Sequence, residues 1–347
     1  MSINATTTAL EIVLPGQVEP EGLLITHREL PAPGRGQALV RVEASGVSFA
    51  EQQMRRGKYY DQPAYPFVPG YDLVGTVEAV GPEVEAGLVG TRVAALTKIG
   101  GWSSHVLLDA ADLVAVPAGL DPADAETFVV NGITAWQMLH RIARVRAGQT
   151  VLVHGANGGV GSTLVQLARL AGARVIGTAS ARNAERVRAL GAEPVDYRGD
   201  IVAQVRALAP AGVDAVFDHV GGPGIVDSFG LLAAGGTLVA YGTAATKDDA
   251  GNSRLPVLLL VGRLLLWNAL PNRRRTHFYN IWAGKRRLAK FRSQLAEDLS
   301  AVLDLAARGQ LTAQVGARFP LSQAAQALAT AESHSVTGKV VLVADGR

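Results

Sequence analysis

Residues 151–173 read VLVHGANGGVGSTLVQLARLAGA, and this stretch decides the fold. An apolar run typical of a buried strand leads into a glycine-rich loop, and a helical pattern begins directly after the loop. Glycine permits a tight turn, while the first turn of a helix offers unpaired N–H groups to an anion. This context predicts a loop that binds the pyrophosphate of a dinucleotide, made by Gly155, Asn157, Gly158, Gly159, Val160 and Gly161.

The spacing of the loop is G-x-x-G-G-x-G rather than the commoner G-x-G-x-x-G, so a glycine-rich turn without a ligand is the alternative. The end of the next strand distinguishes the two nicotinamide dinucleotides, because NAD-specific proteins carry a carboxylate there, about 20 residues on. This chain has Thr178, Ala179 and Ser180 instead, with Arg182 just beyond. A hydroxyl and a guanidinium favour a 2′-phosphate, so we expect NADPH, bound in part by Ser180 and Arg182. An ordinary solvated arginine at 182 is the alternative.

The residues around the loop predict an α/β fold. Beyond Asp121, which precedes Pro122 as a helix N-cap, predicted strands and helices alternate strictly, as in a parallel doubly wound sheet. Up to about residue 120, short apolar bursts between Gly and Pro predict a small β-rich domain. The end of the chain reads strand, helix, strand, and periodicity leaves open whether it extends the parallel sheet or returns to the first domain.

Length, composition and net charge limit the classes of function that the chain can have. A length of 347 residues favours two domains, and 33 basic against 30 acidic residues give a net charge of +3, too weak a field to indicate nucleic acid. The N-terminus shows no secretory signal pattern, so we expect a cytoplasmic protein. The chain has no cysteine, which excludes disulfides, thiolate nucleophiles and zinc sites built on sulfur.

Six stretches in order, NGITAWQML, VLVHGANGGVGSTLVQLA, RALGAEPVDYR, VFDHVGG, LVAYG and TGKVVLV, resemble the medium-chain dehydrogenase/reductase superfamily. Within it the chain is most similar to the zinc-free quinone oxidoreductase branch, which includes the VAT-1-like proteins. The resemblance implies a GroES-like β-rich catalytic domain at 1–125 and 314–347, and a Rossmann domain at 126–313. It also implies a homodimer.

The same resemblance also leads to an expectation about metal binding. Zinc alcohol dehydrogenases of this superfamily carry Gly-His-Glu in the turn that here reads Gly70, Tyr71 and Asp72, and a ligating Cys upstream, where Ser48 or a neighbour stands. A catalytic zinc needs three protein ligands, which this turn does not supply. We therefore expect no metal and hydride transfer to an acceptor activated by conjugation, either a quinone or an α,β-unsaturated carbonyl.

The resemblance also implies site residues. Tyr71 stands in place of the metal-binding His, and Tyr59 follows MRRGK, similar to a stretch whose tyrosine lines the active site in quinone oxidoreductases, although Tyr60 leaves the register open. We name Tyr71, Tyr59 and Ser48 as the candidate catalytic residues, and expect a structural role for Asp72; a packed interface tyrosine is the alternative for Tyr71. Further cofactor contacts implied are Thr134, Tyr197, Val220 and Tyr241.

Residues 255–290 are basic and apolar, with Trp267 and Trp282 beside two clusters of Arg and Lys. One interpretation is an element that touches a membrane surface. The other, which we favour from sequence, is a helix packed over the substrate cleft or between subunits, followed by a solvated basic loop. Two alternative functions accompany the leading one: an enoyl reductase acting on a carrier-bound intermediate, and a non-catalytic NADPH-binding regulatory protein.

Overall fold

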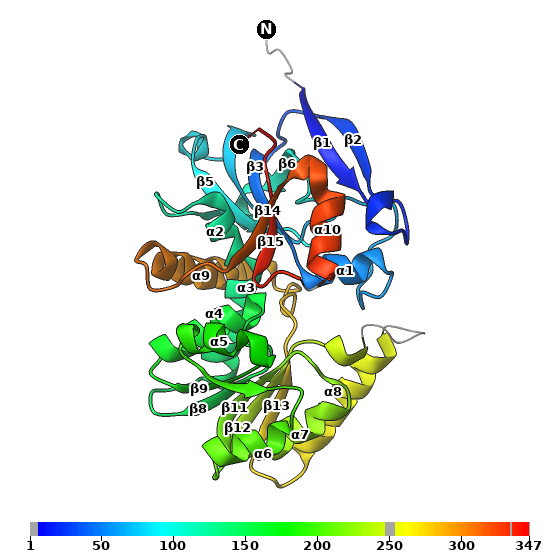
Figure 1. Cartoon of the computed structure of the whole chain (residues 1–347). Helices are drawn as coiled ribbons and strands as arrows, with labels where there is room; N and C mark the ends of the chain where they lie inside the picture. The colour runs from blue at the N-terminus through cyan, green and yellow to red at the C-terminus, as the bar shows by residue number, and fades with distance from the viewer. Residues whose placement is uncertain (1–5, 247–253, 334, 347) are drawn as a thin grey trace. The chain divides into compact units, whose positions relative to one another are not determined.

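The computed structural model describes residues 6–246, 254–333 and 335–346. The chain divides into two compact units, one made of the residues up to Ile133 with those from Gly284 onward, and the other of Thr134–Ala283 (Figure 1). Helix α3 (Val130–Trp136) spans the boundary at 133/134, and a π-helical turn over Gln137–Ala143 follows it. The domain limits predicted from the sequence, 125/126 and 313/314, place α9 (Leu288–Ala307) with the Rossmann domain instead. These limits stay a prediction.

The first unit is built on a seven-stranded sheet with the order β14-β15-β3-β4-β5-β7, in which β6 also pairs with β3. Its strands are β3 (Gln37–Val47), β4 (Asp72–Val80), β5 (Arg92–Leu96), β6 (His105–Asp109), β7 (Val114–Ala115), β14 (Val315–Pro320) and β15 (Lys339–Val343). A separate antiparallel pair is formed by β1 (Thr7–Val13) and β2 (Leu24–Leu30). The predicted β-rich domain is thus confirmed.

The end of the chain returns to this sheet. Strand β15 runs antiparallel to β3, with Val340 opposite Val47, while β14 pairs in parallel with β15. Helix α10 (Ala324–Glu332) packs Ala324, Ala327 and Leu328 into the same apolar cluster as Val340. The structure therefore settles the alternative that periodicity left open.

Two short helices start where local sequence places them. Helix α1 (Phe49–Arg55) begins after Ser48, and α2 (Pro122–Thr127) after Asp121. One carboxylate oxygen of Asp121 accepts hydrogen bonds from the backbone N–H groups of Ala123 at 3.0 Å and Asp124 at 3.1 Å. This N-cap satisfies two donors that the helix itself leaves unpaired, as predicted.

The second unit is a six-stranded sheet, and all its strand pairs are parallel, which confirms the predicted Rossmann sheet. The strand order is β10-β9-β8-β11-β12-β13. The strands are β8 (Thr150–Val153), β9 (Arg174–Ala179), β10 (Glu193–Asp196), β11 (Val213–Asp218), β12 (Leu232–Ala240) and β13 (Arg275–Phe278). The order reverses direction between β8 and β11, and ligands of such sheets bind beyond the carboxyl ends of the strands at this point.

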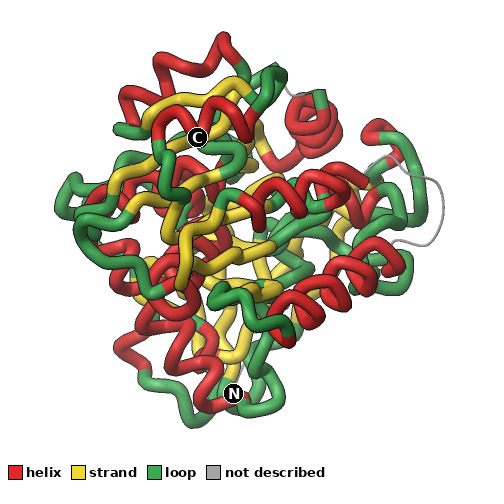
Figure 2. The backbone as a smooth tube through the Cα atoms, turned by 90° about the horizontal axis from the view of Figure 1, so that it is seen from below, coloured by secondary structure: helices red, strands yellow, loops and turns green. Residues whose placement is uncertain are grey.

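Helices connect these strands, and Figure 2 shows them in red around the yellow strands. They are α4 (Gly159–Leu170), α5 (Ala184–Leu190), α6 (Ile201–Leu208), α7 (Ile225–Gly230) and α8 (Arg254–Ala269). Residues of α6, α7 and α8, including Val205, Ile225 and Leu264, share one buried apolar cluster with β8 and β11. From β8 the chain first moves to β9 and β10 on one side and later continues to β11 and β12 on the other. Because such crossovers are right-handed, helices that connect strands in opposite directions lie on opposite faces, so α4 and α5 cover the other face of the sheet.

Candidate active site

The glycine loop lies at the carboxyl end of β8, at the point where the strand order reverses. Gly158 is the N-cap of α4, and no side chain caps the helix. A Cβ atom on Gly161 would lie 2.1 Å from the carbonyl oxygen of Gly155, so only glycine lets the helix approach the loop this closely. The N-terminus of a twelve-residue helix is therefore presented above the sheet, as a pyrophosphate site requires.

A buried hydrogen-bond chain supports the loop from below. The Thr178 hydroxyl accepts from the Gly155 N–H at 3.0 Å and lies 3.4 Å from Nδ1 of His154. Nε2 of His154 lies 3.0 Å from the Ser228 hydroxyl, which donates to Asp218 at 2.6 Å. Burial lowers the pKa of His154 although Asp218 opposes the shift, so a neutral ring joins the ends of three strands.

The predicted residues at the adenosine end come together. Tyr197 follows β10, and its N–H donates to the Ala179 carbonyl at 3.1 Å, next to Ser180. Ser180 is buried and accepts a hydrogen bond from the Asn183 side chain at 3.0 Å, while Arg182 lies exposed in the following turn. The guanidinium of Arg198, which the sequence analysis did not single out, lies 5.5 Å from the centre of the Tyr197 ring.

Two of the predicted residues at the other end of the cofactor, Val220 and Tyr241, lie just beyond the ends of β11 and β12. Asp218 accepts hydrogen bonds from the N–H groups of Val220 and Gly221 at 2.7 and 2.9 Å, and so orients this loop. The rings of His219 and Tyr241 are 5.8 Å apart. Nδ1 of His219 is buried without a partner among the described residues, and such an atom fits a polar group of a bound ligand. Thr134 is buried on α3.

In the first unit the two candidate tyrosines meet. The hydroxyl groups of Tyr59 and Tyr71 are 2.9 Å apart, and the two rings pack edge to face. Tyr60 stacks at a tilt on Tyr59, with 4.8 Å between ring centres. Burial, and then the neighbouring Tyr71 and Tyr60, raise the pKa of Tyr59. Tyr59 therefore stays protonated at neutral pH and can donate a hydrogen bond.

Ser48 contributes to the position of this pair. It is the N-cap of α1, and Glu51 closes a capping box by accepting from the Ser48 N–H at 2.9 Å and from its hydroxyl. The other oxygen of Glu51 accepts from the Tyr71 N–H at 2.7 Å. Ser48 thus acts on Tyr71 through Glu51 in this structure, while its direct role in catalysis stays a prediction.

Asp72 belongs to a buried ionic cluster of three elements. Nζ of Lys339 on β15 lies 2.9 Å from Asp72 on β4 and 2.6 Å from Glu126 on α2, and the same Asp72 oxygen accepts from the Val130 N–H at 2.9 Å. The other oxygens of Asp72 and Glu126 have no partner among the described residues. Burial, and then Asp72, raise the pKa of Glu126 well above its usual range. One proton between the two carboxyls satisfies both oxygens and leaves a neutral cluster.

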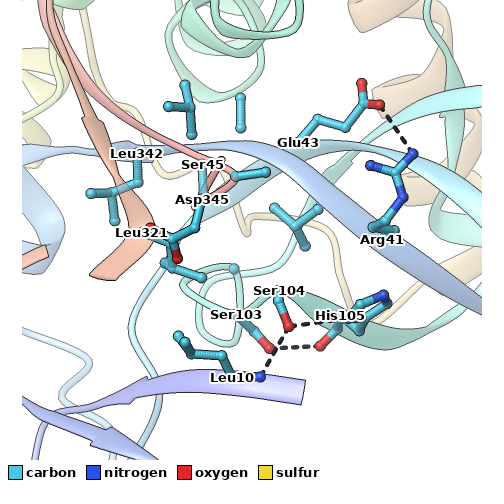
Figure 3. A pocket seen from close by; sticks show the side chains of 15 residues that line it. Leu10, Arg41, Glu43, Ser45, Ser103, Ser104, His105, Leu321, Leu342 and Asp345 are labelled. Atoms are coloured by element: carbon cyan, nitrogen blue, oxygen red, sulfur yellow. Dashed lines mark hydrogen bonds and ion pairs between the residues drawn. The ribbon is translucent and has the colours of Figure 1, made fainter. Parts of the chain in front are cut away.

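A cavity of about 370 Å³ lies elsewhere in the first unit, between β3, β15 and the segment before β6 (Figure 3). Its polar side chains are already hydrogen-bonded: Ser45 donates to the Asp72 carbonyl at 2.7 Å and Ser103 to the His105 carbonyl at 2.6 Å. None of the predicted site residues lines it. We assign it no function.

Comparison with known proteins agrees with this geometry. Residues 34–118 match the family model of the alcohol dehydrogenase GroES-like domain, and residues 190–342 that of the zinc-binding dehydrogenase. The solved structure of a mycobacterial quinone oxidoreductase is 30% identical, with a TM-score of 0.80, over 96% of this chain and 99% of that one. The chain belongs to the medium-chain dehydrogenase/reductase superfamily.

Two curated relatives refine the placement. The synaptic vesicle membrane protein VAT-1 homolog of Danio rerio is 32% identical over 91% of this chain and 66% of its own length, which confirms the expected VAT-1-like branch. The phthioceranic/hydroxyphthioceranic acid synthase of Mycobacterium tuberculosis is 34% identical over 96% of this chain but only 15% of its own length. This medium-chain dehydrogenase/reductase thus spans only part of each of these two proteins.

One of the matching family models is named for zinc binding, but the residues of this chain do not fit a zinc ion. Tyr71 is hydrogen-bonded to Tyr59, and Asp72 is paired with Lys339. Within the described residues, no group of three His, Asp or Glu side chains is placed to hold a metal ion. We therefore derive no step through zinc.

Several functional contacts of this dehydrogenase/reductase escaped the sequence analysis. Glu51, His154, Ser228, Glu126 and Lys339 carry no motif of their own. Only the helix-cap pattern S-x-x-E at Ser48 and Glu51 offered a local signal. The other contacts join residues from 10 to 267 positions apart, and no motif in the sequence marks them.

We expect Gly161→Ala to lower the affinity for NADPH by tenfold or more, because its Cβ would displace the Gly155 carbonyl. Gly230→Ala, in a helix with no atom within 4 Å of the added Cβ, is the matched control. Fluorescence titration with NADPH measures both. Equal affinities of the two variants would show that the loop does not hold the cofactor.

We expect Glu126→Gln to become more stable relative to the wild type as pH rises. The raised pKa means that the stability contributed by Glu126 is present below its usual value of 4.5 and is lost as pH rises through the folded-state pKa. The amide keeps the hydrogen bonds without titrating. Urea unfolding at acidic, neutral and alkaline pH measures the difference, with exposed Glu185→Gln as control. Parallel pH profiles for wild type and Glu126→Gln would contradict the shared proton.

Proposed function

We propose that this oxidoreductase oxidises NADPH and reduces a quinone or an α,β-unsaturated carbonyl compound. The observation that carries the proposal is the hydrogen-bonded phenol pair of Tyr59 and Tyr71. Tyr71 stands in the turn in which the resemblance places the metal-binding His of zinc-dependent relatives. A related mycobacterial structure, 30% identical over 99% of its chain, was solved in complex with NADPH. The protonated hydroxyls replace a Lewis acid as the group that stabilises negative charge on the acceptor oxygen.

The cofactor supplies a hydride, and the protein must orient the acceptor and manage one proton. An acceptor with a conjugated carbonyl takes the hydride at carbon, and the resulting charge spreads onto its oxygen. The hydroxyl groups of Tyr59 and Tyr71 are 2.9 Å apart, and one donates to the other. We propose that, when an acceptor binds, one of these hydroxyl groups turns to donate to the acceptor oxygen. This hydrogen bond stabilises the enolate or phenolate, which then receives a proton from solvent or from the phenol.

The preference for NADPH rests on the adenosine end. Four side chains follow the ends of β9 and β10: Ser180, Arg182, Tyr197 and Arg198. The Asp196 carboxylate accepts a hydrogen bond from the backbone N–H of Arg198 at 3.1 Å. Guanidinium groups bind a 2′-phosphate by charge-assisted hydrogen bonds, whereas NADH has no charge at this position.

A second candidate acceptor is a carrier-bound enoyl thioester. It is favoured by the 34% identity to the mycobacterial acid synthase over 96% of this chain. An enoyl thioester is also a conjugated carbonyl, so the same phenol pair serves both. Turnover of an enoyl-pantetheine thioester without turnover of soluble quinones or enones would favour this candidate, and NADPH binding with no turnover on either would favour a regulatory role.

We expect Tyr59→Phe and Tyr71→Phe each to lower kcat by about a hundredfold, because one preorganised donor contributes about 3 kcal/mol to stabilising an oxyanion. The affinity for NADPH should not change. Tyr65→Phe, which removes a hydroxyl that donates to the Met54 carbonyl at 2.6 Å, is the control. Loss of NADPH absorbance against quinones, enals and enones measures the rates. Wild-type rates in both variants would exclude the phenol pair from the reaction.

We expect Arg182→Gln to weaken NADPH binding by about tenfold, since one charge-assisted hydrogen bond contributes about 1.5 to 3 kcal/mol. Binding of NADH should stay the same. Arg188→Gln, at an exposed arginine paired with Glu185, is the control. Titrations with both dinucleotides measure the ratio. An equal loss for NADPH and NADH would place Arg182 away from the 2′-phosphate.

A further inference from the structure

Helix α8 is apolar on two sides. Leu260 and Leu264 are buried against the sheet of the second unit, with Trp267 packed beside them. On the other side Leu258, Leu259, Leu265 and Leu266 are 60–66% exposed. Leu258 and Leu265 are seven residues apart, as are Leu259 and Leu266, and two helical turns bring each pair to the same face of the helix. We call this face, with Leu255 and Leu270 at its ends, the leucine stripe.

The orientation of the stripe is fixed by hydrogen bonds to the neighbouring strand β13. The side chain of Asn268 donates to the Thr276 carbonyl at 2.8 Å and accepts from the Thr276 N–H at 2.8 Å. The Thr276 hydroxyl donates to the Leu264 carbonyl at 2.7 Å, and Asn272 donates to the Trp267 carbonyl at 2.7 Å. Rotating α8 to bury the stripe would break the three contacts with Thr276, so the exposure is built into the unit.

The charge of this part of the chain is strongly one-sided. Between Asp249 and Glu297 the sequence has ten arginines and lysines and no acidic residue, although the whole chain carries only +3. Arg263 lies four residues after Leu259 and three before Leu266, on the face of the stripe. Arg273 and Arg275 follow the end of the helix and are exposed. Cations therefore border the leucine side chains.

These features distinguish between two partners. A second copy of the chain, related by a two-fold axis, would bring the same basic segment to both sides of the contact, where like charges repel. A bilayer with anionic lipids offers acyl chains to the leucines and phosphates to the arginines at once. In the part of the chain that the structure describes, no helix is long and apolar enough to cross a bilayer, so α8 would lie along the surface.

We propose that α8 docks the protein on the surface of a membrane that contains anionic lipids. The leucine stripe enters the boundary between headgroups and acyl chains, and Arg263 extends its side chain back to the phosphates. Arg273 and Arg275 add long-range attraction that salt weakens. This docking is independent of the reaction proposed above.

The test is co-sedimentation of the full chain with vesicles of phosphatidylcholine alone and of phosphatidylcholine mixed equally with phosphatidylserine. We expect binding to the mixed vesicles only, with a partition coefficient that falls as salt is added. Leu258→Ser combined with Leu265→Ser should lower it by about tenfold or more, and Arg263→Gln combined with Arg275→Gln by a similar factor. Leu170→Ser, at a leucine that is 47% exposed on α4, is the matched control and should bind as the wild type does.

Thermal unfolding and NADPH titration check that each variant is folded. Equal binding of the wild type to both kinds of vesicle, or unchanged binding of the double variants, would overturn the proposal. Sedimentation equilibrium without lipid decides the remaining alternative. If the wild type self-associates and the double leucine variant is monomeric, the stripe is a contact between copies and not a membrane surface.

Discussion

The ammonium group of Lys339 is the contact on which the catalytic unit depends. It joins the last strand of the chain to Asp72 at the start of β4 and to Glu126 on α2, and its side chain is only 4% exposed. A Cβ atom on Gly46 would lie 2.2 Å from the Lys339 side chain, so position 46 needs glycine to leave space for that side chain. Because a buried charge without its partner is costly, the three elements are stabilised only together. Tyr71, the residue before Asp72, inherits its position from this cluster.

In the cofactor-binding unit the corresponding constraint is the close approach of helix α4 to the glycine loop. Gly161 lets α4 begin against the carbonyl of Gly155, and the chain of Thr178, His154, Ser228 and Asp218 then ties the loop to three neighbouring strands. All these groups are neutral or hydrogen-bonded, so the site is organised before a ligand binds. Preorganised donors do not have to reorient when an anion arrives, which is how a fixed loop favours pyrophosphate over water.

The proposed chemistry and the proposed docking use separate parts of the molecule. The phenol pair belongs to the β-rich unit, where the hydroxyl groups of Tyr59 and Tyr71 are hydrogen-bonded to each other. The leucine stripe belongs to α8 of the Rossmann unit, where apolar and basic side chains are exposed. The expected homodimer and cytoplasmic location stay predictions.

The amino-acid sequence by itself determined the features that depend on neighbours along the chain. These are the parallel sheet, the glycine loop, the N-cap at Asp121 and the family, because turns, caps and hydrophobic periodicity are encoded within about ten to twenty residues. Tertiary structure decided the return of β15 to β3, the hydrogen bond between Tyr59 and Tyr71, the Lys339 cluster and the outward face of α8. Tyr59 and Tyr71 are 12 residues apart, but the others are contacts, or the lack of one among the described residues, between segments far apart in sequence. Burial and pairing of this kind arise only once the chain has folded, so no local pattern contains them.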